Sequence, residues 1–363
     1  MAQFKTNMIV GKRESVVDEI LLLNPHQTPM LNAVGFGAPV VQTTHYWLED
    51  EMYGYQSVVN GAVDEAATDI VVADIEPFRV EQVVQVGDEL MKVTDVNTGT
   101  NTITVIRGYA DTEAAAIEDG ATIEVLFVEG VEGADARAAR HKPRVKVENI
   151  TQIFDDTISI SGSAEATSQH AISDLYNYEK AKKQLELALQ LEKAVINGIK
   201  YENGDVRQMQ GMRQFIKTNV DDAGGSALDA SIINNLAREI YEKGGFQGGS
   251  RHAIIVPAKQ KQALSALDQD KIRLDRAENV RGQVVEWFVS DFARFEIILN
   301  NNLRPDELFL VDLNRIAIRP LQTREFFHEF LGRVGDRTEG QIIGEYTLEF
   351  KQEKAHGRVT GLA

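Results

Sequence analysis

The chain contains no cysteine among its 363 residues. This absence excludes disulfide bonds, thiolate metal sites and cysteine nucleophiles, and it is compatible with synthesis in the cytosol. The first 20 residues lack an apolar segment preceded by basic residues, and no run of about 18 apolar residues occurs anywhere. We therefore expect a soluble chain that is neither secreted nor membrane-inserted. Its 43% hydrophobic and 26% charged residues suffice for two or three compact units.

Basic residues are scarce in one stretch of the chain and concentrated in the next. Residues 61–135 hold 17 Asp and Glu but three basic residues, which accounts for most of the net charge of −17. Just downstream, residues 136–147 contain no acid and five cations, namely Arg137, Arg140, Lys142, Arg144 and Lys146. Such an asymmetry carries more information about partners than the net charge does.

Three interpretations fit the basic segment 136–147. Basic clusters bind nucleic acid through its phosphates, but this one lacks interleaved aromatic residues, and an acidic chain repels DNA at long range. A solvated charged strand is the main alternative. We prefer an ion-paired contact with an acidic neighbouring subunit, because complementary charge is common in interfaces. The five cations are therefore the candidate subunit contacts.

A long amphipathic helix is predicted over residues 172–199. Its apolar residues recur at steps of three and four or their multiples, which places them along one stripe, and polar residues fill the opposite side. At 1.5 Å per residue such a helix spans about 40 Å. A rod of this length suits a structural spine, although the pattern fits an ordinary core helix equally well. The stripe consists of Leu175, Tyr178, Leu185, Leu189, Ile196 and Ile199.

The acidic region has the pattern of short β-strands. Between Phe78 and Phe127, four β-rich segments follow one another, with alternation at Ile103 and Val105 and a hairpin loop at 97–101. About 50 residues of this kind can form a small β-domain. Its polar flanks suit tethers, so the domain is predicted to be inserted in the chain and not terminal.

The remainder predicts a mixed α/β region. A capping box at Ser226 and Asp229 starts a helix that ends at a glycine pair, and residues 253–256 begin a series of strands with short turns. Near the end, residues 341–352 alternate apolar and polar side chains. This strand is expected to be half-buried and to close the chain. Its polar side consists of Glu345, Thr347, Glu349 and Lys351.

Catalytic signatures are weak. His328-Glu329 begins like a zinc-protease motif, but Gly332 stands where the second histidine is required. Residues 244–251 have the glycines of a phosphate loop without its Lys-Ser/Thr pair, so a helix-ending turn is the better interpretation. Ser161 is not in a Gly-x-Ser-x-Gly elbow. The sequence therefore predicts no catalytic residue, no cofactor and no metal site, and the chain is not expected to be an enzyme.

Several segments, taken in order, resemble one protein family. They are GKRESVVDEILLLNPHQTPMLNAV and THYWLEDEM near the start, VENITQIFDDTISISGSAEAT before the long helix, GGFQGG and IIVP after it, and GEYTLEFKQEKAHGRVTGL at the end. This series is similar to the major capsid proteins of tailed bacteriophages, closest to the group of the podovirus SU-ten major capsid protein. The resemblance covers nearly the whole chain except residues 70–140.

The resemblance implies an α+β fold, the Hong Kong 97-like capsid fold, with a small all-β domain at about 70–135 inserted in its extended loop. We expect the acidic insert outside the shell or over a neighbour, where the basic segment pairs across subunits. The implied parts are an N-terminal arm at 1–40, an extended β-loop at 41–160, a spine helix of the peripheral domain at 165–202, an axial domain at 203–320 and return strands of the peripheral domain at 321–363.

The implied function is that of a structural major capsid protein. It would self-assemble as pentamers and hexamers into an icosahedral head shell that encloses double-stranded DNA without sequence-specific binding. About 40 residues before the loop are too few for a fused scaffold, so a separate scaffolding protein is expected, with portal and decoration proteins as further partners. The location would be the virion, assembled in the host cytoplasm, with no membrane partner.

Alternatives stay open at this point. An encapsulin-like shell around enzyme cargo would have much the same parts, and an acidic β-domain also suits a binding or tail protein. Some relatives with this fold form lysine to asparagine cross-links, for which Lys92, Lys142 and Lys146 are the candidates here. Plain solvated lysines are the preferred interpretation, because no acceptor or general base is matched to them.

Overall fold

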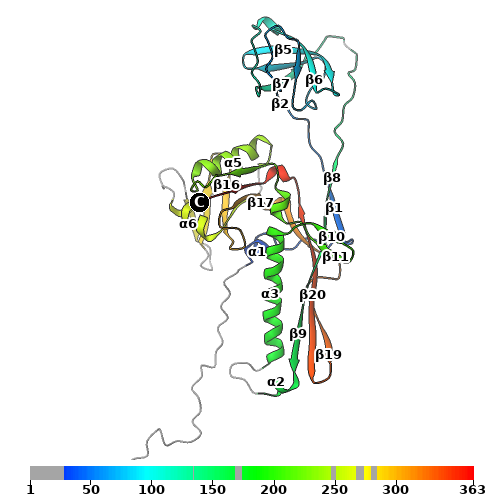
Figure 1. Ribbon diagram of the computed structural model, residues 1–363, viewed down its shortest axis with the longest axis vertical. Helices are drawn as coiled ribbons and strands as arrows, with labels where there is room; N and C mark the ends of the chain where they lie inside the picture. The colour runs from blue at the N-terminus through cyan, green and yellow to red at the C-terminus, as the bar shows by residue number, and fades with distance from the viewer. Residues whose placement is uncertain (1–27, 134, 168–173, 247–250, 267–273, 279–283) are drawn as a thin grey trace, which may run out of the picture. The chain divides into compact units, whose positions relative to one another are not determined.

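The computed structural model describes residues 28–133, 135–167, 174–246, 251–266, 274–278 and 284–363 (Figure 1). The chain divides into two compact units. One, which we call the barrel unit, is formed by Leu48–Val145, and the other, the two-sheet unit, by the described residues on either side of it. Most of the predicted N-terminal arm, residues 1–27, lies outside the described residues.

The barrel unit is built from six short antiparallel strands. In spatial order they are β2 (Gln56–Val58), β7 (Thr122–Val128), β4 (Gln82–Val86), β5 (Glu89–Asn97), β6 (Thr102–Ile106) and β3 (Asp69–Val71), and the short 3₁₀ helix η2 (Tyr109–Asp111) follows β6.

The two outer strands of this sheet meet and close it. Just beyond β2 and β3, the backbone N–H of Asn60 donates to the carbonyl of Val71, and that of Ala73 donates to the carbonyl of Val58, both at 2.8 Å. Closure removes the exposed edges that an open sheet would carry. Inside lies a separate apolar core, in which Ile70, Met91, Ile103 and Ile123 are fully buried.

The four strand segments expected in the acidic region correspond to β4, β5, β6 and β7, and residues 97–101 lie at the β5–β6 hairpin. The barrel, however, already begins at β2, upstream of residue 70. β2 and β3 have three residues each, which is too short for an alternating pattern to be visible in the sequence.

The two-sheet unit contains a seven-stranded mixed sheet. Its order is β12 (Val220–Asp222), β21 (Gly357–Thr360), β17 (Leu308–Asp312), β13 (His252–Val256), β16 (Arg294–Leu299), β15 (Val284–Val289) and β14 (Leu274–Glu278). Alternation along β13 buries both faces: Ile254 and Val256 pack with helices α5 (Ala230–Glu242) and α6 (Ala258–Ala266), whereas Ala253 and Ile255 pack toward α3.

The second sheet centres on the long strand β20 (Arg337–Phe350). β9 (Gln152–Ser161) pairs along one side of it, and β19 (Phe327–Arg333) and β18 (Ile316–Pro320) follow one another on the other side. Helix α3 (Leu175–Asn197) runs along β9 and β20 (Figure 1).

Shorter elements complete this unit. They are the paired strands β1 (Thr44–Glu49) and β8 (Val145–Ile150), the hairpin of β10 (Tyr201–Asn203) and β11 (Val206–Gln208), the helices α1 (Pro29–Val34), α2 (Gly162–Ala166) and α4 (Met212–Phe215), and the 3₁₀ helices η3 (Leu313–Arg315) and η4 (Glu353–Ala355).

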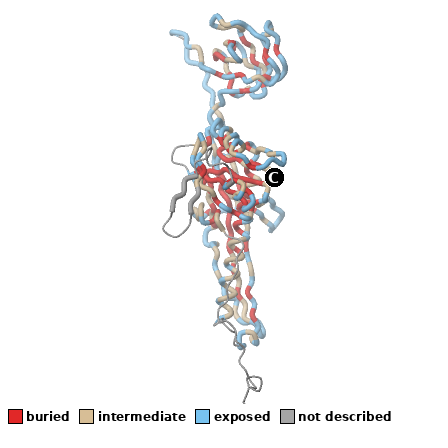
Figure 2. The backbone as a smooth tube through the Cα atoms, turned by 90° about the vertical axis from the view of Figure 1, so that its left-hand side faces the viewer, coloured by how far each residue is buried: buried red, intermediate tan, exposed pale blue. Residues whose placement is uncertain are grey.

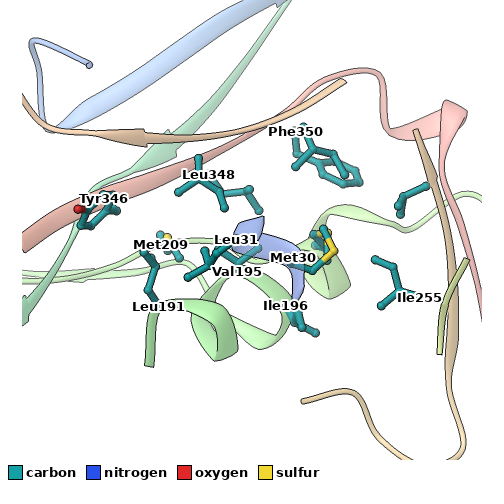
Figure 3. Close-up of a cluster of buried hydrophobic side chains, with 14 of the residues drawn as sticks. Met30, Leu31, Leu191, Val195, Ile196, Met209, Ile255, Tyr346, Leu348 and Phe350 are labelled. Atoms are coloured by element: carbon teal, nitrogen blue, oxygen red, sulfur yellow. The ribbon is translucent and has the colours of Figure 1, made fainter. Parts of the chain in front are cut away.

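The predicted long helix is present, but its most buried face differs from the predicted stripe. Leu187, Leu191 and Val195 are fully buried, and the stripe omitted them. Leu185 and Leu189 are half-buried, and Ile199 lies beyond the helix end and is 65% exposed. The reason is that α1, β20 and the seven-stranded sheet surround the C-terminal half of α3, so more than one side of it is covered (Figure 3).

Two other local expectations were wrong. The α5 helix is capped by Asp229, whose carboxylate accepts from the N–H of Ala230 at 2.7 Å, and Ser226 lies upstream of the cap. The C-terminal half of strand β20 is buried on both sides and not half-buried, because Glu345, Thr347 and Glu349 are covered as well. It also does not close the chain, since β21 follows it and joins the other sheet.

Burial is densest around the seven-stranded sheet and decreases along β9 and β20 toward the β19 hairpin (Figure 2). Among the described residues, no helix combines the length and the apolar character needed to cross a membrane.

Candidate assembly surfaces

The basic segment is not a strand over most of its length. Residues 135–144 form neither helix nor strand, and β8 begins at Val145, so a charged strand, the main alternative interpretation, is wrong for this part. Each of the five predicted contact residues has a partner within its own chain. These partners are Glu81 for Arg137, the carbonyl of Pro77 and the ring of Tyr53 for Arg140, Glu51 and Glu76 for Lys142, Asp50 for Arg144, and Glu148 and the ring of Tyr46 for Lys146.

Four of these cations, from Arg137 to Arg144, hold residues 135–144 against the rest of the barrel unit. Arg137 is 2.9 Å from Glu81, and its side chain is still 37% exposed. Arg144 is 3.3 Å from Asp50 and is 69% exposed. Exposed pairs of this kind contribute about 0–1 kcal/mol each, so they can be exchanged for partners on another molecule at little cost to the fold.

The same segment lines a shallow cavity of the barrel unit with a volume of about 300 Å³. Arg140, His141 and Lys142 form one wall, and Phe78 and Val96 contribute apolar surface. The volume is at the lower end of the range for small-molecule sites. We assign no ligand to it.

The basic residues of the acidic stretch also have partners inside the barrel unit. Arg107 donates to both carboxylate oxygens of Glu89 at 2.7 Å, and the two side chains are almost completely buried. Burial alone would raise the pKa of Glu89, but hydrogen bonds from Arg107 and from the N–H groups of Ala115 and Gly108 lower it. This pair ties the start of β5 to the segment that follows β6.

Lys92 contacts Glu129, which also accepts a hydrogen bond from the hydroxyl of Tyr109 at 2.9 Å. The contact with Glu129 raises the pKa of Lys92, and Glu76 does the same for Lys142. A protonated amine cannot attack an amide, so these contacts favour the interpretation of the two residues as ion-paired lysines over cross-link nucleophiles.

Two buried glutamates on the polar side of β20 connect distant segments. Glu345 accepts from Thr151 at 2.6 Å and from Arg207 at 2.8 Å. Glu349 is contacted by His45 on β1 and Arg319 on β18. Although burial works in the opposite direction, hydrogen bonds from Lys351, His45 and Arg319 hold the pKa of Glu349 at about 2. Alternation alone placed these carboxylates toward solvent; the arginine-bearing strand 316–320 was the signal that could have revealed them.

A third buried carboxylate fixes the start of the described chain. Glu192 on α3 accepts from the backbone N–H groups of Met30 and Leu31, each at 3.0 Å, and from the amide of Asn300 at 2.6 Å. It therefore caps α1 from another helix, while Thr28 provides no side-chain cap. Burial raises the pKa of Glu192 against the effect of these hydrogen bonds. Nothing in the sequence pattern distinguished this residue.

An apolar edge is exposed on β19. Phe330 is 61% exposed and Leu331 48% exposed. Within the described part of the chain, β19 pairs with β20 alone, and a bulge lies between Phe330 and Gly332. An exposed apolar edge favours association, while a bulge limits uncontrolled strand addition. His328 of the rejected zinc motif lies in this strand and contacts the hydroxyl of Tyr176 at 2.8 Å.

The spine helix on a sheet centred on β20, together with a second, mixed α/β sheet, is the Hong Kong 97-like capsid fold. Solved structures with this arrangement include the Cyanophage A-1(L) capsid, with a TM-score of 0.56 and 10% identity, covering 99% of this chain and 98% of that one. The capsid of an empty GTA particle has a TM-score of 0.53 and 9% identity over 99% and 97% of the chains. The structure of Mycobacterium phage Adephagia has a TM-score of 0.51 and 10% identity, covering 99% of this chain and 98% of that one. These likenesses establish the fold.

The family follows from the sequence itself. The profile of the SU10 major capsid protein family matches residues 2–363, and the chain belongs to this family. No curated protein matches the sequence. The chain is thus a structural protein of a phage head shell, and the predicted Hong Kong 97-like fold, family and shell function are confirmed.

Proposed function

We propose that this chain builds an icosahedral head shell by association with copies of itself as pentamers and hexamers. The shell encloses double-stranded DNA without sequence-specific contacts, and the chain has no catalytic role. The observation that carries this proposal is the family match over nearly every residue, from 2 to 363. It is supported by a subunit with exposed apolar and exchangeable charged surfaces, the features from which repeated contacts are made.

The parts of the capsid subunit are assigned within the same proposal. Residues 1–40 are the N-terminal arm, with α1 anchored by Glu192, and residues 41–160 are the extended loop that carries the barrel unit. α3 and the β20 sheet belong to the peripheral domain. The seven-stranded sheet belongs to the axial domain. The expected border at residue 320 cuts across both sheets: it separates β18 from its partner β20 and β17 from its partner β21.

The contact surfaces are the five cations of the basic segment and the apolar edge of β19. In the shell, Arg137, Arg140, Lys142, Arg144 and Lys146 exchange or share their partners with carboxylates of a neighbour. A separate scaffolding protein, a portal and decoration proteins are the further partners. The shell assembles in the host cytoplasm and is located in the virion.

The test is negative-stain electron microscopy of the purified full chain, with size-exclusion chromatography beside it, across salt and protein concentration. We expect closed shells, rings of five or six, or tubes. Nuclease-protected DNA in particles recovered from cells would separate a genome shell from a shell around protein cargo. A monomer at every concentration, also after co-expression with a scaffolding protein and a portal, would contradict the proposal.

A further inference from the structure

Three arginines of the two-sheet unit gather around one buried glutamate. Glu307 is 2% exposed and accepts two hydrogen bonds from Arg213, at 3.0 Å from Nε and 2.6 Å from Nη2. Arg358 is close enough for its charge to interact with Glu307, Arg213 and Arg304. Arg304 precedes Glu307 in a turn, in which the backbone N–H of Glu307 donates to the carbonyl of Arg304 at 3.3 Å. The cluster belongs to the seven-stranded sheet, whereas the β19 edge belongs to the sheet centred on β20.

The register of the sheet explains the convergence. Arg358 on β21 lies opposite Phe309 on β17, and Glu307 precedes Phe309 by two residues. Side chains two apart on a strand, and side chains directly opposite across an antiparallel pair, share one face. Helix α4 covers this face, since its Phe215 packs in the same core as Phe309, and α4 supplies Arg213.

The cluster contains more positive charge than its own partners balance. Among the described residues, the side chains of Arg304 and Arg358 form no ion pair and no hydrogen bond, and the buried Nε of Arg358 has no partner. Burial lowers the pKa of Arg358, the cations of Arg213 and Arg304 lower it further, and Glu307 opposes them. A partly buried guanidinium group without an anion, such as that of Arg358, is energetically costly. This cost favours the binding of an anion.

We propose that Arg213, Arg304 and Arg358 form a socket for a carboxylate supplied by a neighbouring copy of this chain. The inference rests on the proposed self-assembly. Guanidinium groups bind carboxylates through paired, charge-assisted hydrogen bonds. A carboxylate is favoured over a phosphate of the enclosed DNA because each copy carries 55 acidic against 38 basic residues, so carboxylates are the more abundant charged groups that a neighbouring copy brings. Arg304 is exposed and is the residue that meets the incoming group first.

The first test asks whether the socket binds carboxylates, without relying on assembly. The thermal midpoint of the unassembled full chain is measured in sodium citrate and in sodium chloride of equal ionic strength. We expect a citrate-specific rise of about 3 °C, the size that saturating a weak site produces. Arg304→Ala should abolish the rise, whereas Arg238→Ala on α5 should keep it, because Arg238 is exposed and paired with Glu242. No citrate-specific rise in the wild type would overturn the socket.

The second test asks where the carboxylate comes from. We expect Arg304→Glu to lower the assembled fraction about tenfold, the effect of losing one good charged contact, with an unchanged thermal midpoint of the unassembled chain. Arg238→Glu is the matched control and should assemble normally. Normal assembly of empty shells with loss of retained DNA would identify a phosphate and overturn the proposal. A wild type that binds citrate but never assembles would overturn the neighbouring copy as the source.

Discussion

The contacts that stabilise the barrel unit join residues close in sequence, whereas those that stabilise the two-sheet unit join residues far apart in sequence. In the barrel unit, β4, β5 and β6 pair with their neighbours in sequence, and the core is drawn from one continuous stretch. In the two-sheet unit, the amide of Asn149 donates to the carbonyl of Leu348 across 199 positions. Local contacts let a segment fold alone, whereas contacts across the whole chain require all of it to be present.

The two units also differ in how many of their acidic residues are buried. The barrel unit leaves most of its carboxylates in solvent and buries Glu89 with one arginine. The two-sheet unit buries several, and each connects segments that are remote in sequence: Glu192, Glu307, Glu345 and Glu349. Charge in the barrel is therefore mainly a surface property, while charge in the other unit is part of what fixes its topology.

The strongest way to sharpen this comparison is to separate the units. Replacing residues 50–143 by a short Gly/Ser linker should leave the two-sheet unit folded, because β1 and β8 still meet at the junction. The isolated fragment 48–145 should fold by itself with a cooperative thermal transition followed by circular dichroism. Deleting only 75–130 is the contrasting control, since it removes β7 and β6, the strands along which β2 and β3 pair, and should cause aggregation. An unfolded 48–145 fragment would contradict the independence of the barrel.

A single substitution should affect one unit and spare the other. Arg107→Met leaves Glu89 buried without its cation, and losing one partner of a buried pair costs about 3–5 kcal/mol. Urea unfolding of the full chain should show the barrel transition shifted and the two-sheet transition in place. Arg137→Met, which breaks an exposed pair with Glu81, should cost about 1 kcal/mol or less and serves as the control. Equal costs for the two variants would contradict the burial argument.

Mild acid should distinguish the units by way of His356. Its Nδ1 accepts the N–H of Asp312 and its Nε2 faces the carbonyl of Lys351, so the ring is neutral, and burial lowers its pKa to about 3. At pH values between the pKa of His356 in the unfolded chain, about 6.5, and its pKa in the folded chain, about 3, the unfolded chain binds more protons. The free energy of unfolding therefore falls as the pH falls.

The two-sheet unit should therefore lose about 2 kcal/mol between pH 6.5 and 5. Glu349, with a pKa of about 2, adds a further loss below about pH 4.5. In the barrel, the lowered pKa of Glu89 gives a loss that also begins only below about pH 4.5. Chemical unfolding at a series of pH values measures this. His356→Gln should flatten the dependence above pH 5, and an unchanged slope would show that another group is responsible.

Patterns of apolar residues were enough to predict the long helix and four barrel strands, since these depend on local periodicity. The capsid fold was predicted from the resemblance of several segments, taken in order, to one protein family. The apolar patterns were not enough for β2 and β3, whose three residues leave no period to detect. Nor could they reveal Glu192, Glu345 or Glu349 as buried, because a carboxylate is buried only when distant donors reach it. The partners of the basic segment escaped prediction for the same reason, since Arg144 contacts Asp50 across 94 positions.

The basic segment is where we expect the smallest effect on stability together with a large effect on association. Reversing Arg137, Arg140 and Arg144 to Glu removes exposed contacts of the barrel unit, which should lower its stability by about 1 kcal/mol. Assembly should decrease much more strongly, because rim charges act on association. Thermal melting of the unassembled chain and particle yield by sedimentation compare the two, with Arg238→Glu as the control. A lowered midpoint together with an unchanged yield would mean that the cations only hold residues 135–144 on the rest of the barrel unit, and the subunit contact would have to be sought at the β19 edge.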